Sequence, residues 1–276
     1  KQYSKMLGAI IGDMVGSIYE RQNIKYKPTQ LFTQHSNFTD DTVTNIAILD
    51  CYKNHRKLRE FDFDGELGKQ PKKADVIYSL KHWCNKYIYV GYGKMFREWI
   101  QGNSTLGYKS YGNGGAMRIL MVSEYFAKKG YTLSSIEKKI KLITNVTHND
   151  PTAVKGALCI AEMMYFIIRE GSDKKELEDY VKEIYYPLDY TYKGLIKDYK
   201  FDVSTKGSIP QAIWVFLNTK NFEDCLKTAV SIGGDTDTIC AIACALADNY
   251  YNHIPLYIVR ECLDRLPDEM LAIIED

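Results

Sequence analysis

The chain has 276 residues, of which 45% are hydrophobic and 26% are charged, with 36 lysines and arginines against 35 aspartates and glutamates. This composition is that of an ordinary globular protein, and it disfavours a disordered chain, a collagen-like fibre or a small disulfide scaffold. The formal net charge of +1 gives no overall signature of binding to nucleic acid or to an anionic membrane. A chain of this length can bury most of its surface without metal or disulfide support, so any metal site would serve chemistry.

The cysteines and the apolar segments indicate the cellular compartment in which the protein works. Seven cysteines, an odd number, are scattered mostly through apolar stretches, which favours reduced and buried thiols. The longest apolar segments, 157–168 and 239–247, are shorter than a bilayer span, and Asp13 interrupts the one candidate for a signal peptide. We therefore expect a cytoplasmic protein that makes no membrane contact. The sequence shows no apolar heptad, so we expect a monomer.

Apolar residues recur at helical period along most of the chain, and few segments alternate as strands do. We expect helices near residues 4–19, 41–53, 74–87, 93–101, 115–129, 134–146, 151–170, 173–184, 208–218, 222–231, 237–251 and 256–274, the last broken near Pro267. Neither a flexible linker nor an internal repeat divides the sequence, which predicts one all-α domain over residues 1–276. The segment from Asn54 to Lys73, where acidic residues lie between basic clusters, is expected to be a solvated loop.

Two short acidic motifs each open an apolar helix: residues 39–42, Thr-Asp-Asp-Thr, and residues 234–238, Gly-Asp-Thr-Asp-Thr. One such motif would be ordinary helix capping, because Asp and Thr are favoured at helix N-termini. Two aspartates in each motif exceed what capping needs. If the two helix starts converge, the crowded carboxylates require protons or cations. Oxygen ligands favour Mg²⁺ or Mn²⁺ over zinc, and four acids with two hydroxyls suffice for two ions.

A glycine-dense turn, Ser-Tyr-Gly-Asn-Gly-Gly-Ala-Met-Arg over residues 110–118, leads directly into a helix. Backbone N–H groups at such a turn can hold phosphate oxygens, but Gly and Asn also form turns that bind nothing, so both interpretations stay open. A weaker glycine turn at residues 91–93 would let a ligand approach the backbone. His148 lies between two predicted helices, where either a structural role or stacking on a ligand is open.

The first predicted helix carries Gly8, Gly12 and Gly16 at every fourth position. One face of this helix is therefore bare, and another helix can pack closely against it. Asp13, among apolar neighbours, is better explained as a buried hydrogen-bond acceptor than as a catalyst. Glu20 would share its face if the helix continued, near the C-terminal end, where the helix dipole mildly raises the proton affinity of a carboxylate.

Taken in order, residues 8–20, 39–42, 112–118, 147–148 and 233–238 resemble the motifs of the ADP-ribosylglycohydrolase family, typified by dinitrogenase-reductase-activating glycohydrolase. The match spans about residues 6–251. The resemblance implies an all-α fold with a binuclear Mg²⁺ or Mn²⁺ centre at helix N-termini, and hydrolysis of the bond between C1″ of ADP-ribose and its acceptor. The metal ligands it implies are Thr39, Asp40, Asp41, Asp235, Asp237 and Thr238.

The segment that ends in Glu20 looks like the branch of this family that includes serine-ADP-ribose hydrolases, and the resemblance makes Glu20 the general base. It also implies a substrate-binding set of Gly91, Gly93, Ser110, Tyr111, Gly112, Asn113 and His148. The implied partner is an ADP-ribosylated protein or a small ADP-ribose conjugate. The linkage stays open among arginine, serine, acetate and a nucleic-acid base, as does the choice between Mg²⁺ and Mn²⁺.

Two other function classes remain. One is a non-catalytic protein on the same fold, either an ADP-ribose-binding module or a crystallin-like relative; intact acidic motifs and the presence of Glu20 argue against it. The other is an all-α metal-dependent nucleotide phosphohydrolase, which usually carries E-x-x-E or His-Asp pairs within helices. The sequence contains no His-Asp pair.

Overall fold

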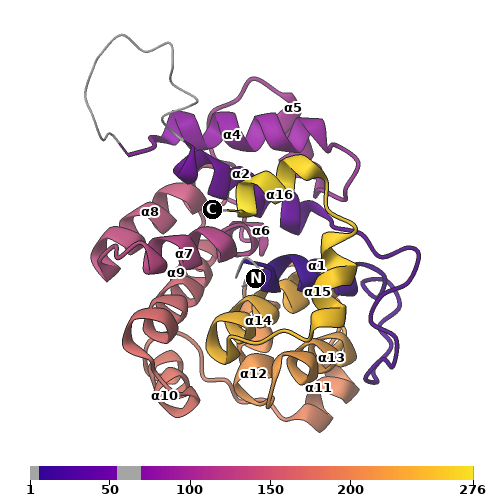
Figure 1. Ribbon diagram of the computed structural model, residues 1–276. Helices are drawn as coiled ribbons and strands as arrows, with labels where there is room; N and C mark the ends of the chain where they lie inside the picture. Colours follow the sequence, from indigo (N-terminus) through magenta and orange to yellow (C-terminus); the bar gives the residue numbers. More distant parts are fainter. Residues whose placement is uncertain (1–5, 55–69, 276) are drawn as a thin grey trace.

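Helices form most of the computed structural model, which describes residues 6–54 and 70–275 (Figure 1). Within these ranges, β-structure is limited to one isolated bridge between Gly112 and Ser204. The all-α prediction is therefore confirmed. Most of the loop predicted between Asn54 and Lys73, residues 55–69, lies outside the described residues.

The first half of the chain forms α1 (Gly8–Ser17), α2 (Asp40–Lys53), α4 (Lys73–Lys86), α5 (Lys94–Gln101), α6 (Gly114–Met117), α7 (Leu120–Lys128) and α8 (Leu133–Asn145). The second half forms α9 (Pro151–Tyr165), the π-helical turn η1 (Phe166–Glu170), α10 (Lys174–Ile184), α11 (Tyr192–Asp198), α12 (Ile209–Leu217), α13 (Phe222–Ile232), α14 (Thr236–Tyr251), α15 (Leu256–Leu263) and α16 (Asp268–Ile274). Most predicted helices match these bounds within a few residues.

The structure differs from the predicted helices in three places. The helix expected near 115–129 is two helices, α6 and α7, and α1 ends at Ser17 rather than near residue 19. The sequence does not predict α11, which begins after Thr191, whose hydroxyl accepts a hydrogen bond from the Gly194 N–H. With seven residues and only Leu195 buried, α11 is too short to show a helical period.

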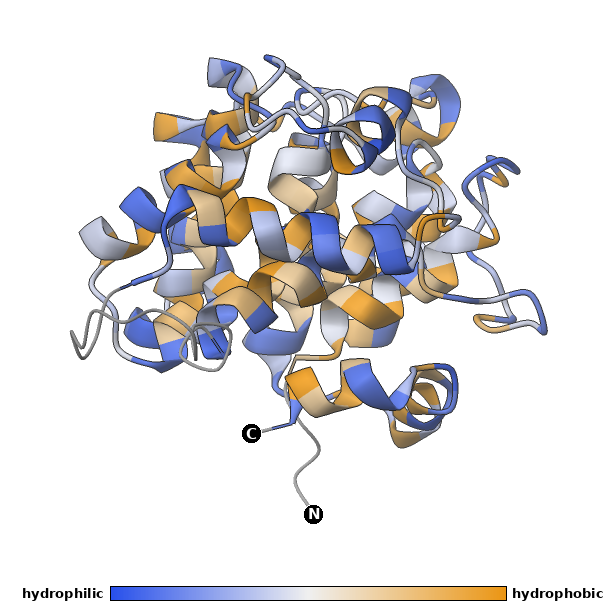
Figure 2. Ribbon diagram, turned by 90° about the horizontal axis from the view of Figure 1, so that it is seen from above, coloured by the Kyte–Doolittle hydropathy of each residue, from blue (hydrophilic) through white to orange (hydrophobic). Residues whose placement is uncertain are grey.

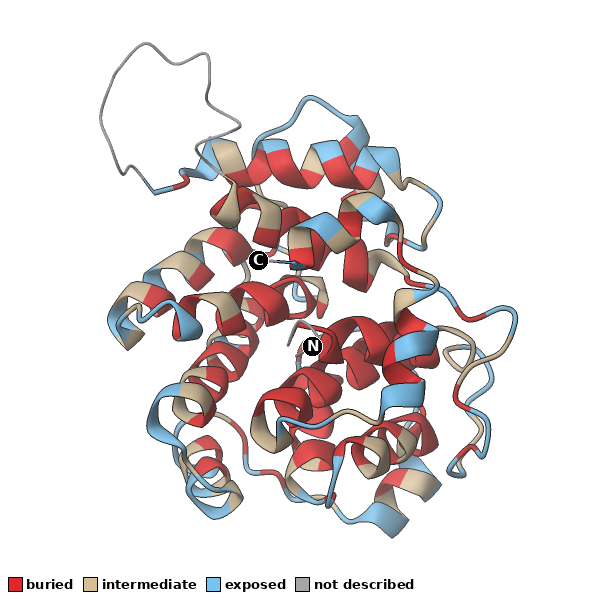
Figure 3. Ribbon diagram, in the orientation of Figure 1, coloured by how far each residue is buried: buried red, intermediate tan, exposed pale blue. Residues whose placement is uncertain are grey.

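The helix pair α1 and α14 packs antiparallel at backbone contact. A Cβ atom on Gly12 would lie 2.2 Å from the carbonyl oxygen of Cys240, and one on Gly8 would lie 2.4 Å from that of Cys244. The predicted bare face of α1 is therefore confirmed, and α14 occupies it. Both helices are buried along almost their whole length in the middle of the fold (Figure 3).

One continuous hydrophobic core joins the helices, and the outer ones carry hydrophilic residues on their exposed sides (Figure 2). All seven cysteines are buried and unpaired. The expectation that no apolar segment is long enough for a membrane is wrong as to length, because the helical run Pro151–Glu170 has 20 residues and the required composition. Of its most apolar stretch, 56% is buried inside the fold, so core packing explains the same composition.

We expect Gly12→Ala to lower the free energy of unfolding by about 1–3 kcal/mol, because the new methyl group must displace the α14 backbone. Urea unfolding followed by circular dichroism measures the change. Gly93→Ala is the matched control, since nothing lies within 4 Å of a Cβ at that position. Equal stability of the two variants would contradict the tight contact between α1 and α14.

Candidate functional site

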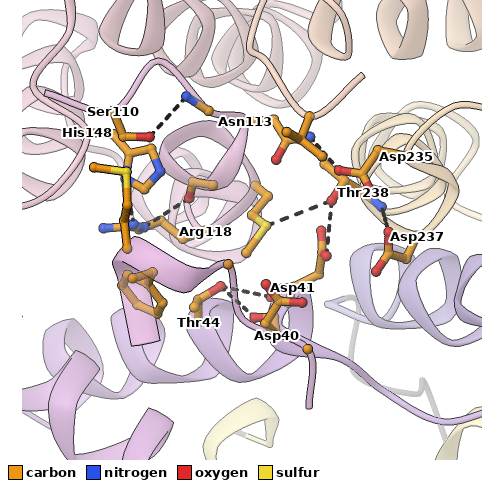
Figure 4. Close-up of a pocket in the computed structure, with 18 of the residues that line it drawn as sticks. Asp40, Asp41, Thr44, Ser110, Asn113, Arg118, His148, Asp235, Asp237 and Thr238 are labelled. Carbon is orange, nitrogen blue, oxygen red and sulfur yellow. Dashed lines mark hydrogen bonds between the residues drawn. The ribbon is translucent and has the colours of Figure 1, made fainter. Parts of the chain in front are cut away.

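The two acidic motifs meet at the N-termini of α2 and α14 (Figure 4). The Thr238 hydroxyl donates a hydrogen bond of 3.1 Å to the Asp41 carboxylate. From the other motif, the Thr39 hydroxyl lies 3.2 Å from a carboxylate oxygen of Asp237. The structure therefore supplies the convergence that the sequence could not show.

Asp13 of α1 links the start of α2 to this meeting point. One of its carboxylate oxygens accepts hydrogen bonds from the Thr39 N–H, at 2.7 Å, and from the N–H and hydroxyl of Thr42, at 3.1 and 2.6 Å. Its other oxygen accepts a bond of 2.6 Å from the Thr39 hydroxyl. Burial raises the pKa of Asp13 to about 6 although these bonds oppose the shift. Asp13 is thus the buried acceptor that the sequence favoured.

The pKa values of the clustered aspartates are strongly shifted. Burial, followed by repulsion from neighbouring carboxylates, raises the pKa of Asp40, Asp41 and Asp237 well above the usual range. Burial also raises the pKa of Asp235, whose side chain makes no capping hydrogen bond to α14. One oxygen of Asp41 is buried with no hydrogen-bond partner among the described residues. These carboxylates are therefore more than helix caps, and none of them forms an ion pair with a lysine or arginine among the residues that the structure describes.

Two groups of carboxylates could each hold a cation. The first consists of Asp13, Asp41 and Asp237, and the second of Glu20, Asp235 and Asp237; within each, one oxygen per residue lies within 4.8 Å of the others. All donors are oxygens, which fits a hard divalent ion. Asp13 already accepts four hydrogen bonds, so Asp41 and Asp237 are the freer members of the first group. The groups share Asp237 and add Asp13 and Glu20 to the predicted ligands, whereas Asp40 is in neither.

A cavity of about 350 Å³ opens beside the acids. Twelve of the predicted site residues line it: Glu20, Asp40, Asp41, Gly91, Gly93, Ser110, Gly112, Asn113, His148, Asp235, Asp237 and Thr238. Thr39 contacts the acids without forming part of the wall, and Tyr111 is not on the wall and is 64% exposed. Glu20 lies in the turn after α1, because the helix ends at Ser17 and does not carry it on the face of Asp13.

The glycine turn is anchored on both sides. The Gly112 N–H donates to the Ser110 hydroxyl at 3.1 Å, and the Asn113 N–H donates to the Val203 carbonyl at 2.8 Å, so two of its backbone donors are used within the protein. The Asn113 side chain donates to Asp235 at 2.6 Å. Asn113, predicted to bind substrate, thus ties the glycine turn to the acid cluster.

Arg118 is the main site residue that the sequence analysis did not single out. It is 1% exposed and lines the cavity opposite the acids (Figure 4). Its Nε donates to the Gly114 carbonyl at 3.0 Å, whereas its Nη1 has no hydrogen-bond partner among the described residues. The spacing of Arg118 four residues after Gly114 placed it beside the turn, but only the fold shows that it is buried there.

Burial and the neighbouring Arg118 together set the protonation state of His148. The Arg118 Nη2 lies 3.1 Å from the Nδ1 of His148, and a guanidinium can only donate, so Nδ1 accepts. Burial and the charge of Arg118 lower the pKa of His148 well below its usual value, so the ring is neutral and carries its proton on Nε2. That atom faces the glycine turn, since a Cβ on Gly114 would lie 3.0 Å from it. Arg118 and His148 therefore offer N–H donors to an anion.

Comparisons with known proteins identify the family to which the chain belongs. The family model for ADP-ribosylglycohydrolase matches residues 3–276. The chain belongs to the ADP-ribosylglycohydrolase family. It is therefore an enzyme of the ADP-ribosylhydrolase class, as the motifs predicted.

Individual members of this family are distant in sequence. ADP-ribosylhydrolase ARH3 of Mus musculus is 24% identical over 89% of this chain and 82% of that protein. ADP-ribosyl-[dinitrogen reductase] glycohydrolase of Rhodospirillum rubrum is 25% identical over 89% and 83%. A solved ADP-ribosylglycohydrolase-related protein complex matches with a TM-score of 0.61 and 21% identity, over 98% of this chain and 95% of that one, and this likeness confirms the fold.

The raised pKa values predict how stability depends on pH. In the presence of a chelator, Asp13 keeps its proton in the folded protein up to about pH 6. In the unfolded chain the same carboxyl group loses its proton near its ordinary pKa. Stability is therefore highest at acidic pH and falls as pH rises from about 4 to about 6, by about 3 kcal/mol in all and by about 2 kcal/mol between pH 4.5 and 6. Thermal unfolding between pH 4.5 and 7.5 measures this loss, and we expect Mg²⁺ or Mn²⁺ to restore the stability at pH 7.5.

Asp41→Asn serves as the matched variant for this measurement. Removing one buried charge should make the chelated protein more stable at pH 7.5 and weaken its response to the cation. A wild-type protein that is equally stable at both pH values and insensitive to divalent cations would contradict the proposed cation site.

Proposed function

We propose that the enzyme hydrolyses the glycosidic bond at C1″ of ADP-ribose attached to a protein side chain or to a small O-linked acceptor, with two Mg²⁺ or Mn²⁺ ions as cofactors. The observation that carries this proposal is the position of Glu20. This carboxylate lines the cavity of about 350 Å³ and belongs to one of the two acid groups, so a proton acceptor and the cation ligands border one space.

The residues present fit the cofactors. Asp41, Asp235 and Asp237 offer buried carboxylate oxygens, Asp40 lies beside them, and Thr39 and Thr238 add hydroxyls. When bound, the ions supply Lewis-acid polarisation and orientation of the vicinal hydroxyls of the distal ribose. Asp13 accepts a hydrogen bond from Thr39, and Asn113 donates one to Asp235, so both proposed ligands are held in position.

Glu20 is suited to act as a general base. Burial and then the charge of Asp235 raise its pKa, which makes it a stronger proton acceptor than a free carboxylate. In the proposed reaction, the oxygen of a water molecule bonds to C1″ while Glu20 accepts one of its protons. The bond from C1″ to the acceptor breaks, and the acceptor leaves with the electron pair and takes up a proton.

The opposite side of the cavity is suited to the rest of ADP-ribose. Arg118 and His148 present N–H donors to the diphosphate beside Ser110 and Gly112. Gly91 and Gly93 also line the cavity, and because they carry no side chain a ligand can approach their backbone closely. Arg118 also stacks on Phe96, whose ring centroid lies 5.3 Å from the guanidinium carbon. Phe96 and its neighbour Met95 provide an apolar wall for the adenine ring.

The proposal includes a protein-linked substrate and a cytoplasmic monomer. Among the relatives is a protein named ADP-ribosylarginine hydrolase Tri1 of Pseudomonas putida, 24% identical over 89% of this chain and 69% of that protein. Together with the Rhodospirillum rubrum enzyme, its name supports an ADP-ribosylated protein as substrate. The seven buried, unpaired thiols support a reducing compartment.

Glu20→Gln should lower the rate of ADP-ribose release by about 10²–10⁴-fold, because the amide cannot accept the proton from water. Binding of free ADP-ribose, measured by calorimetry, should persist in this variant and serves as the folding control. Release from arginine-linked, serine-linked and O-acetyl conjugates, followed by chromatography, also identifies the product. Full activity of the variant would contradict the role of Glu20, and AMP as the product would favour the phosphohydrolase.

Arg118→Met should weaken ADP-ribose binding by about 10–100-fold, because a buried charge-assisted hydrogen bond to phosphate is lost. Adenosine, which has no phosphate, provides the control ligand, and Arg118→Lys restores the charge without the fork of donors. An equal loss of affinity for adenosine and for ADP-ribose would indicate damage to the fold rather than to a phosphate contact.

A further inference from the structure

A second cavity, of about 430 Å³, lies next to the first and is lined by Glu20, Arg21, Asn23, Phe201 and Gly234. Glu20 is the one lining residue common to both cavities. The proposed binding of ADP-ribose uses none of the other four. The position of these four residues next to Glu20, the proposed base, therefore needs a separate explanation.

The walls of the second cavity are fixed to one another by Lys25. Its ammonium group donates to the carbonyls of Leu195, at 3.2 Å, Tyr199, at 2.6 Å, and Ile232, so three acceptors satisfy its three protons. These bonds join the segment that carries Arg21 to α11 and to the end of α13. Phe201 follows α11, and Gly234 follows α13, so both belong to the anchored parts.

Two side chains pack closely against the backbone of two glycines beside the second cavity. A Cβ on Gly233 would lie 1.9 Å from the side-chain oxygen of Asn23, and one on Gly234 would lie 2.4 Å from the ring of Tyr199. Both glycines have positive φ, of 77° and 78°, so the turn before Asp235 depends on them. The cavity is therefore preformed rather than left between loose loops.

Two side chains in the wall of the second cavity are exposed and can contact a partner. Phe201 is 56% exposed, although it is a large aromatic residue. Arg21 is exposed, and its guanidinium makes no hydrogen bond or ion pair within the described ranges. The positive charge of Arg21 lowers the pKa of Glu20, against the larger effects of burial and of the Asp235 charge, so Arg21 attracts the Glu20 carboxylate. An open aromatic ring beside a free guanidinium suits a peptide with an apolar and an acidic side chain.

We propose that this cavity is the acceptor subsite, which holds the polypeptide segment that carries the ADP-ribose. An apolar side chain of the segment packs on Phe201, and an acidic one pairs with Arg21. The inference rests on the proposed hydrolysis, in which the breaking bond joins C1″ to the acceptor at Glu20. With ADP-ribose in the first cavity, the acceptor leaves C1″ beside Glu20, where the second cavity begins.

The test compares three substrates with the full-length enzyme and Mg²⁺: two ADP-ribosylated peptides that differ only in a Glu or a Lys next to the modified residue, and O-acetyl-ADP-ribose. We expect the wild-type enzyme to prefer the Glu peptide by about two- to five-fold in kcat/KM, the effect of one exposed ion pair. Arg21→Glu should reverse this preference. Phe201→Ala should lower the ratio of peptide to O-acetyl-ADP-ribose turnover by about five-fold.

Tyr78→Ala is the matched control for Phe201→Ala, since Tyr78 on α4 is an aromatic residue of similar exposure, 58%. This control should leave the ratio unchanged. If the wild-type enzyme releases ADP-ribose but Arg21→Glu and Phe201→Ala leave both ratios unchanged, the acceptor subsite is wrong and the proposed function stands. If the wild-type enzyme releases ADP-ribose from none of the three substrates, the proposed function itself fails.

Discussion

The contact between α1 and α14 is the constraint on which the site depends. Glycines at positions 8, 12 and 16 let the two backbones touch, with Gly16 against Asp237 at the start of α14. From the same helix, Asp13 holds the N-cap of α2 through Thr39. One short helix thus fixes two distant acidic motifs against each other, and Glu20 follows directly from its end.

This arrangement has an energetic cost in the absence of cations. Asp13, Asp41, Asp235 and Asp237 are each at most 6% exposed, and their mutual repulsion would favour separation of α2 from α14. The large core and the rigid α1–α14 contact hold them together. Such a site gives up stability for pre-organisation, since the ligand oxygens are in place before the ion or the substrate arrives.

Features that depend only on residues close together in the chain could be predicted from the sequence. The glycine period of α1 and the paired aspartates at two helix starts follow from short-range rules, and both appear in the structure. Arg118 and the acceptor-side wall could not be predicted in this way. Burial of Arg118 depends on α5 and on His148, and Phe201 reaches the site because the bridge between Gly112 and Ser204 anchors its loop. The balanced net charge likewise gives no sign that the buried guanidinium of Arg118 lies opposite several buried carboxylates.

Anomalous diffraction from crystals grown with Mn²⁺ shows whether the acidic helix starts hold two cations, because it locates the ions without reference to activity. We expect two manganese peaks between the N-termini of α2 and α14, with carboxylate oxygens of Asp41, Asp235 and Asp237 among their ligands. No peak at this place, or manganese bound elsewhere while these acids remain unliganded, would contradict this expectation.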